Sequence, residues 1–126
     1  MTPRDEARLW TQNADGDFNM VDVAVRAGLS DWNQICFHAQ QGAEKYLKAL
    51  LIAGSSEPPR THNLSLLLEL AGANHGGLQV LAPDCALLTP FAVTERYATR
   101  VPDDATARAV IAAGYRVRDA VRRLLG

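Results

Sequence analysis

Histidine side chains are the groups in this sequence best suited to moving protons at neutral pH. There are three, His38, His62 and His75, and they have the reference pKa nearest 7. General acid–base catalysis uses such a group, and a neighbouring cation can stabilise a phosphate. Arg60 precedes His62 with one residue between them. A site of this kind would have to be assembled in space, from His62 with Arg60 or Arg100. The other interpretation is that His62 caps or orients a loop.

A second set of polar side chains falls at helical spacing. They are separated by three, four and three positions, so they line one flank of a helix: His38, Gln41, Lys45 and Lys48. Gln40, Glu44 and Lys48 form a neighbouring row. One interpretation is a solvated flank, on which the Glu44–Lys48 pair at i,i+4 stabilises the helix by roughly a few tenths of a kcal/mol. The other is a polar groove that binds phosphates or the acidic residues of a partner.

The sequence predicts neither a metal site nor a cofactor. Cys36 and His38 are two positions apart, so they point to different sides of a helix, and no Cys-x-x-Cys or His-x-x-x-His pair occurs. Cys36 is therefore expected in the core. Gly72, Gly76 and Gly77 follow a predicted helix and no strand, which excludes a glycine-rich phosphate loop.

The polar flank lies on a helix predicted from Asp31 to Ala53, with Ser30 as a possible cap. Apolar residues recur there at spacings of three and four, and Gly54 stands just past the end, where a helix-ending glycine belongs. At 1.5 Å per residue this helix is about 34 Å long, the length of a small bundle. We expect it to be the central helix, with its apolar side buried and its lysines and glutamines accessible.

One helix is predicted before this central helix in the sequence and one after it. The first runs from Pro3 to Ala27 and allows a break at Asp15-Gly16, because glycine inside a helix costs on the order of 1 kcal/mol. After a connector from Ser55 to His62, held extended by its two prolines, a short helix is predicted over Leu64–Ala71. Either Asn63 or Thr61 caps that helix.

The C-terminal part of the sequence predicts two more helices. One opens at Pro83 and reaches about Thr99, with a kink or a break at Pro90. The last is capped by Asp103 or Asp104 and continues to the C-terminus, where arginines suit the negative end of the helix dipole. The predicted fold class is all-α, an up-and-down antiparallel bundle of four to five helices in a single domain, 1–126.

Composition narrows the class of protein further. The chain has 126 residues, 48% of them hydrophobic and 21% charged, with a net charge of -1, which is typical of one soluble domain. Alanine and leucine outnumber valine, isoleucine and threonine, which favours helix. No apolar run approaches the roughly 20 residues of a membrane span, and no secretory signal is recognisable, so we expect no membrane association and a cytoplasmic location.

Charge is unevenly distributed along the chain. Seven arginines and three acids follow position 95, whereas the first 29 residues hold three arginines and five acids. Arg96, Tyr97 and Arg100 begin the basic part. Arg100 either pairs with Asp103 as a structural contact or binds a phosphate through its guanidinium. The basic surface could meet RNA, a protein partner or a second protomer, although a pI near 6.3 argues against strong nonspecific nucleic-acid binding.

Taken together, these segments resemble the HEPN family, the higher eukaryotes and prokaryotes nucleotide-binding domain. The resemblance rests on three stretches and covers nearly the whole chain: the run from Phe37 to Leu51 with its Gln-Gln and Glu-Lys pairs, Pro58-Pro59-Arg60-Thr61-His62-Asn63-Leu64, and Thr99-Arg100-Val101-Pro102-Asp103. Val101 stands where the family usually has tyrosine. Many members are metal-independent ribonucleases that use an arginine and a histidine four to six residues apart, and that motif is missing here.

The resemblance implies a homodimer that works with a small nucleotidyltransferase, often in a toxin–antitoxin or defence pair. Our leading hypothesis is such a partner protein without catalytic residues, which binds a nucleotide or RNA phosphate. The candidate binding residues are His38, Gln41, Lys45, Lys48, Arg60, His62, Arg96, Tyr97 and Arg100. The alternatives are a degenerate metal-independent ribonuclease and a purely structural helical interaction module.

Overall fold

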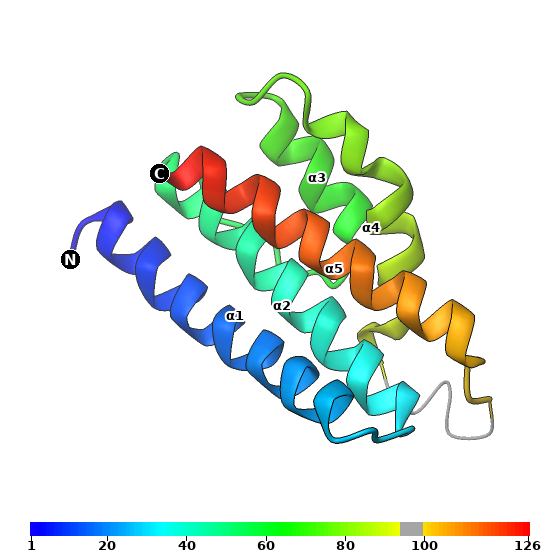
Figure 1. The fold of residues 1–126 in the computed structure, drawn as a ribbon. Coiled ribbons are helices and arrows are strands. Elements are labelled where there is room, and N and C mark those ends of the chain that lie inside the picture. The colour runs from blue at the N-terminus through cyan, green and yellow to red at the C-terminus, as the bar shows by residue number, and fades with distance from the viewer. Residues whose placement is uncertain (94–99) are drawn as a thin grey trace.

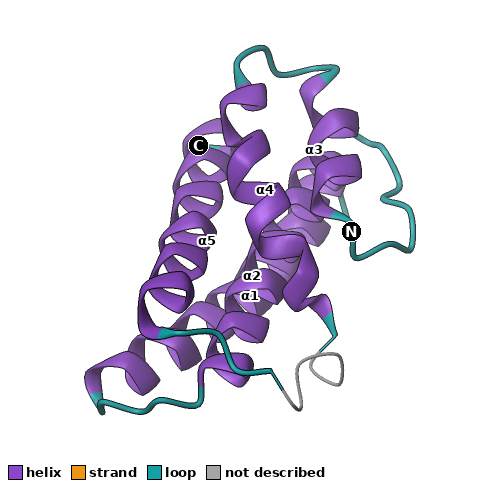
Figure 2. Cartoon of the chain, turned by 90° about the vertical axis from the view of Figure 1, so that its right-hand side faces the viewer, coloured by secondary structure: helices purple, strands orange, loops and turns teal. Residues whose placement is uncertain are grey.

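The computed structural model describes residues 1–93 and 100–126, and in these ranges the chain is an all-α bundle, as predicted (Figure 1). Three long helices, α1 (Pro3–Arg26), α2 (Trp32–Ala53) and α5 (Asp104–Leu125), lie along one another. The shorter α3 (Leu64–Gly72) and α4 (Ala82–Leu88) form a second layer beside α2 and α5 (Figure 2).

α1 is continuous through Gly16, so the break allowed at that position does not occur. A capping box fixes its start, because Thr2 Oγ1 accepts from the Asp5 backbone N–H while Asp5 Oδ2 accepts from the Thr2 backbone N–H. The helix ends where Gly28 adopts a φ of +73°, a backbone conformation that favours glycine. These local signals outweigh the single glycine inside the helix.

α2 is the central helix, in contact with α1, α3 and α5. Its apolar side is sealed as predicted, and Cys36 is fully buried. Its polar side differs from the expected solvated flank, because Gln40, Glu44 and Lys48 are buried as well. The row is covered because α1 packs on one side of α2 and the connector 54–63 folds back along it, placing His62 beside Glu44.

The aromatic ring of Phe18 joins the three long helices. It lies against Gly42 of α2, where an added Cβ would be 2.6 Å from the ring, and against Gly114 of α5, where that distance would be 3.4 Å. Glycine at these positions therefore lets the backbones of α2 and α5 approach one ring of α1. Phe18 itself is 3% exposed.

α2 and α5 run in the same direction within the bundle. Trp32 Nε1 at the start of α2 donates to Asp104 Oδ1 at the start of α5 (2.8 Å), and Arg122 Nε near the end of α5 donates to Tyr46 Oη (2.9 Å). The two helices are parallel because the connector 54–63 returns the chain to the middle of α2 before α3 begins. α1 and α5 consequently flank α2 and leave a groove between them.

The helix predicted to open at Pro83 is interrupted near Pro90, as expected. α4 ends at Leu88, and a 3-10 turn, Thr89–Ala92, follows with Pro90 near its start. This placement suits proline, which cannot continue an α-helix in its interior. The last expected turns, with Arg96 and Tyr97, lie in 94–99, outside the described residues. Of the alternative caps, Asn63 and not Thr61 caps α3, and Asp103 and not Asp104 caps α5.

Candidate functional site

Asp17 of α1 binds two of the candidate residues on α2. Lys45 Nζ donates to Asp17 Oδ2 (2.7 Å), and His38 Nδ1 lies 2.9 Å from Asp17 Oδ1. The Asp17 side chain is 11% exposed. A carboxylate this well covered needs a counter-charge, and Lys45 supplies it. Lys45 and His38 are thus held toward α1, and the charge of Lys45 is largely balanced by Asp17.

Glu44 gathers a second group of polar side chains. Its carboxylate accepts from Lys48 Nζ (3.1 Å) and Gln40 Nε2 (3.2 Å), and His62 Nδ1 lies 2.8 Å from Oε1. Gln40 Nε2 also donates to the backbone carbonyl of His62 (3.2 Å), and Gln41 Nε2 donates to Gln40 Oε1 (2.8 Å). The network ties α2 to the connector 54–63, so it fixes the loop that enters α3.

His62 is the most exposed member of this group. Its side chain is 61% exposed, whereas that of Glu44 is only 5% exposed. A carboxylate at Nδ1 selects the tautomer in which that nitrogen carries a proton, so Nε2 is left as the free acceptor. The geometry is that of a histidine oriented by a carboxylate, as in acid–base sites.

The remaining candidates lie apart from these groups. Arg60 and Arg100 are exposed, and neither is in an ion pair with another described residue. Asp103, the expected structural partner of Arg100, accepts instead from the Thr106 backbone N–H (2.7 Å) as the cap of α5. Arg96 and Tyr97 fall outside the described residues. The structure thus sorts the candidates into an Asp17 group, a Glu44 group and two exposed arginines.

Sequence reasoning missed a third polar group, in the groove between α1 and α5. Tyr46 Oη donates to Asp15 Oδ1, and Arg122 reaches both partners, with Nη2 2.8 Å from Asp15 Oδ1. Burial raises the pKa of Tyr46 to about 12, and the hydrogen bond to Asp15 adds to this. No spacing in the sequence indicates that positions 15, 46 and 122 meet.

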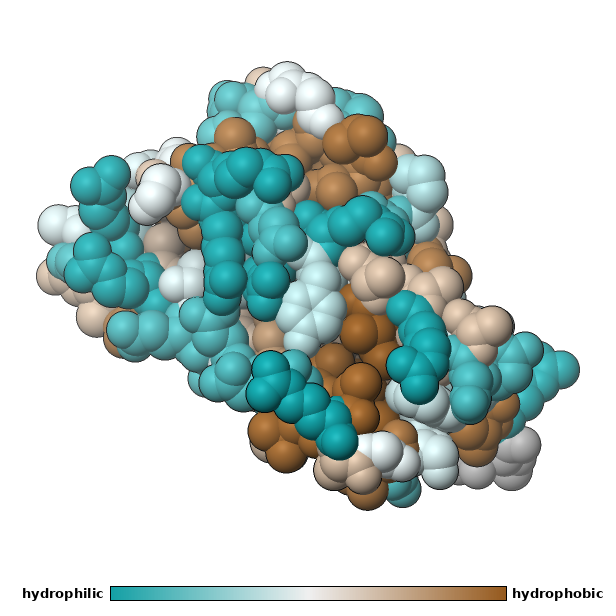
Figure 3. Space-filling view, in the orientation of Figure 1, coloured by the Kyte–Doolittle hydropathy of each residue, from teal (hydrophilic) through white to brown (hydrophobic). Residues whose placement is uncertain are grey.

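The same groove holds a small cavity of about 240 Å³ beside these residues. Arg118 lies over the ring of Tyr115 at 4.5 Å from the centroid and over Phe18 at 5.6 Å. Tyr115 lines the cavity, and the partly buried Val25 and Ile111 stand about one helical turn beyond Asp22 on α1 and Tyr115 on α5, so helical spacing places them on the same sides of their helices. Figure 3 shows apolar side chains open on this face, bordered by hydrophilic ones. Such a mixed groove is typical of surfaces that contact another protein.

The described residues contain no cluster of three or more histidine, cysteine or acidic side chains suited to a metal ion. Both cysteines in the structure, Cys36 and Cys85, are buried thiols, and burial raises the pKa of each to about 12. They are therefore protonated at neutral pH and poor nucleophiles. Over the described ranges, no helix combines the length and the apolar character that crossing a bilayer requires.

Comparison with known proteins identifies the class that this fold and these groups define. The HEPN domain family model matches residues 7–124, so the chain belongs to the HEPN family. Among solved structures, TT1696 from Thermus thermophilus has the same fold, with a TM-score of 0.68 and 25% sequence identity. That alignment covers 94% of this chain and 92% of TT1696. The comparison with curated proteins finds no match.

Proposed function

We propose that this HEPN protein is a non-catalytic dimeric partner of a small nucleotidyltransferase, in a system of the toxin–antitoxin or defence type. The observation that carries the proposal is the pairing of α2's cations with buried carboxylates, Lys45 with Asp17 and Lys48 with Glu44. Charges balanced in this way attract phosphate weakly. They stabilise the bundle, and the missing arginine–histidine motif supports the same conclusion.

The groove between α1 and α5 supports the dimer. It combines partly buried apolar side chains with paired and stacked arginines, the composition of interface centres. A second copy that buries Ile111 and Tyr115 would remove this surface from water. Membership of the HEPN family supports the nucleotidyltransferase as the other partner.

Light scattering coupled to gel filtration tests the dimer. We expect about twice the 13.7 kDa of one chain at micromolar concentration. Ile111→Lys should give the mass of one chain, whereas Val80→Lys, a matched change at a residue that is 78% exposed on the 3-10 turn Leu78–Leu81, should leave the dimer intact. A wild-type mass of one chain would contradict the proposal. A small nucleotidyltransferase encoded beside this protein should co-elute with it, and separate elution would reject that partner.

Arg60, His62 and Arg100 are the residues we propose for contact with a nucleotide or RNA phosphate. The arginines are exposed and outside ion pairs of the described residues, and the His62 side chain is 61% exposed. Calorimetry with ATP and GTP should register heat that falls when Arg60 and Arg100 are changed to Gln and persists in Arg123→Gln, an exposed control. If neither nucleotide gives heat, the chain is a helical interaction module without a nucleotide site.

The His62–Glu44 contact favours one second candidate, a weak metal-independent ribonuclease. Here His62 Nε2 would accept the 2′-hydroxyl proton and Arg60 or Arg100 would stabilise the phosphate. RNA incubated with the protein in EDTA would be cleaved, and the cleavage would be lost in His62→Gln and kept in His75→Gln. Intact RNA with the wild-type protein rejects this candidate.

A further inference from the structure

The side of α1 that faces away from α2 is largely apolar and carries no other described helix. The residues on it recur at alternating spacings of four and three positions, and all of them are exposed and uncharged: Leu9, Asn13, Gly16, Met20, Val23 and Ala27. We call them the outer stripe. Leu9, Met20 and Val23 are 51%, 57% and 65% exposed. Figure 1 shows α1 at the edge of the bundle, with no described helix beyond it.

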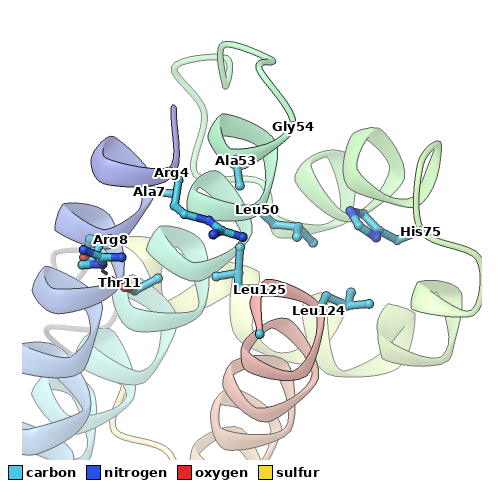
Figure 4. A pocket seen from close by; sticks show the side chains of 11 residues that line it. Arg4, Ala7, Arg8, Thr11, Leu50, Ala53, Gly54, His75, Leu124 and Leu125 are labelled. Atoms are coloured by element: carbon cyan, nitrogen blue, oxygen red, sulfur yellow. Dashed lines mark hydrogen bonds between the residues drawn. The ribbon is translucent and has the colours of Figure 1, made fainter. Parts of the chain in front are cut away.

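The opposite side of α1 makes its contacts with the rest of the chain. Ala7, Ala14, Phe18 and Val21 are buried there. Figure 4 shows Arg4 and Ala7 on this inner side, where they line a cavity of about 530 Å³ whose other walls include the ends of α2 and α5. The outer stripe is therefore not used in folding one chain, and a surface helix normally turns polar residues outward. Such an apolar stripe is typical of a contact with another protein.

Polar side chains follow one edge of the outer stripe at intervals of seven residues. They are Asp5, Gln12, Asn19 and Arg26. In paired helices the residues beside the apolar positions set the choice of partner and its orientation. This edge begins with an acid, ends with a base and has two amides between them. It is complementary to itself when reversed, because Asp5 then meets Arg26 of a second copy and Gln12 meets Asn19 of that copy.

The other edge of the outer stripe disfavours a parallel pair. In a parallel pair the two different edges would lie along each other. The second edge holds Trp10, Asp17 and Ala24. Asp17 is buried and bound by Lys45, so it is not available to a second copy. Asp5 is exposed, and the Arg26 side chain is 79% exposed. Charge complementarity therefore favours an antiparallel pair.

Gly16 lies in the middle of the outer stripe, midway between Asp5 and Arg26. A Cβ at this position would have no other atom of the described chain within 4 Å. Because glycine has no side chain, the backbones of two helices that cross here can approach closely. A two-fold axis near Gly16 then joins the apolar side chains of both copies, Leu9, Met20 and Val23, into one continuous contact.

We propose that the outer stripe binds the outer stripe of a second copy, with the two α1 helices antiparallel and the two-fold axis near Gly16. The α1–α5 groove lies on a different side of α1, the side toward α5. The inference therefore goes beyond the proposed dimer, and chains that use both contacts form assemblies larger than a dimer. One helix pair buries less than the roughly 1,200–2,000 Å² of a stable interface, so this contact forms at higher concentration than the dimer.

Disulfide trapping tests the orientation. Leu9→Cys and Val23→Cys proteins are mixed at submillimolar concentration with oxidised glutathione, and peptide mass spectrometry identifies the positions that are joined. We expect the disulfide between the two variants to form at least about tenfold faster than that of Val80→Cys with itself, because thiols held together have a high effective concentration. Val80, at 78% exposed, is the matched control, and the native cysteines are buried.

Two results of the trapping experiment overturn the proposal. One is a mixed disulfide that forms only at the rate of the Val80→Cys control. The other is a disulfide of Leu9→Cys with itself that forms as fast as the mixed one, because this shows a parallel pair. In an antiparallel pair the two Leu9 positions lie at opposite ends of the contact.

Light scattering at submillimolar concentration gives a second measurement and separates this contact from the proposed dimer. The wild-type mass should exceed that of two chains, Met20→Lys should return it to two, and Val80→Lys should leave it unchanged. A wild-type mass that stays at two chains overturns the proposal. Adding Ile111→Lys to both cysteine variants should leave the mixed disulfide intact, even if the groove dimer fails, and its loss there overturns the proposal by placing the contact in the groove.

Discussion

Replacing Glu44 by glutamine tests whether the buried carboxylate is what stabilises the polar side of α2. The change keeps the shape of the side chain but removes the charge opposite Lys48, whose side chain is only 10% exposed. Removing one partner of a buried ion pair costs roughly 3–5 kcal/mol. Lys48 Nζ also lies 5.9 Å from the ring centroid of Trp10, and a long side chain can turn toward water, so part of that cost is recovered.

We therefore expect Glu44→Gln to lower the free energy of unfolding by about 2–3 kcal/mol. With a urea dependence of roughly 1–3 kcal/mol per molar, the midpoint should fall by about 0.7–3 M. The protein should still fold, because domains of this size are stable by about 5–15 kcal/mol. Helical circular dichroism during urea titration measures the shift.

Two further variants make the test specific. Glu44→Gln combined with Lys48→Met removes both charges and should be more stable than Glu44→Gln alone by at least about 1 kcal/mol, since no unpaired ion remains. Arg26→Gln breaks the exposed Arg26–Asp22 pair and should change stability by less than about 0.5 kcal/mol. The reasoning is refuted if Glu44→Gln costs no more than Arg26→Gln, or if the double variant is the least stable of the three.

Three other predictions follow from the core and its titrating groups. Gly42→Ala should destabilise the protein by about 1–3 kcal/mol, because its Cβ would lie 2.6 Å from the Phe18 ring. Gly16→Ala is the control and should not destabilise the protein, because a Cβ there would have open space around it. Urea unfolding of both variants measures the difference. Cys36 and Cys85, with pKa values raised from 9.0 to about 12, should resist thiol reagents at pH 8 until the protein unfolds; rapid labelling under native conditions would contradict their burial. The pKa of Tyr46 is likewise raised, from 10.0 to about 12, so this phenol and the two thiols stay protonated in the folded state at pH values where the unfolded chain ionises. The free energy of unfolding should therefore fall as the pH rises from about 9 to 12. Tyr46→Phe should weaken the part of that fall above pH 10.

Helix limits were accessible from the sequence because they depend on neighbours along the chain. Gly28 and Gly54 end helices, Asn63 and Asp103 cap them, and Pro90 stops α4. Each signal acts within about one turn of its own position. The fold class followed from these limits and from the period of the apolar residues.

The polar groups could not be predicted in the same way. Lys48 looked exposed from the spacing on α2, and its burial depends on a connector that returns to α2 and on α1 lying across it. Asp15, Tyr46 and Arg122 come from three helices, and the Asp15–Arg122 contact spans 107 positions of sequence. Periodicity reports which face of a helix a residue occupies, and says nothing about which polar side chain of another helix it will meet.

The ring of Phe18, enclosed by Gly42 and Gly114, has a dynamic consequence. A phenyl ring rotates by half a turn about its own axis only when its surroundings move apart, and here the surroundings belong to α2 and α5: Gly42 and Gly114 together with the side chains of Tyr46, Tyr115 and Arg118. The rate of ring rotation, which NMR line shapes report, therefore measures how often the packing between α1, α2 and α5 loosens around Phe18. One side chain thus reports on the packing at the point where the three long helices meet.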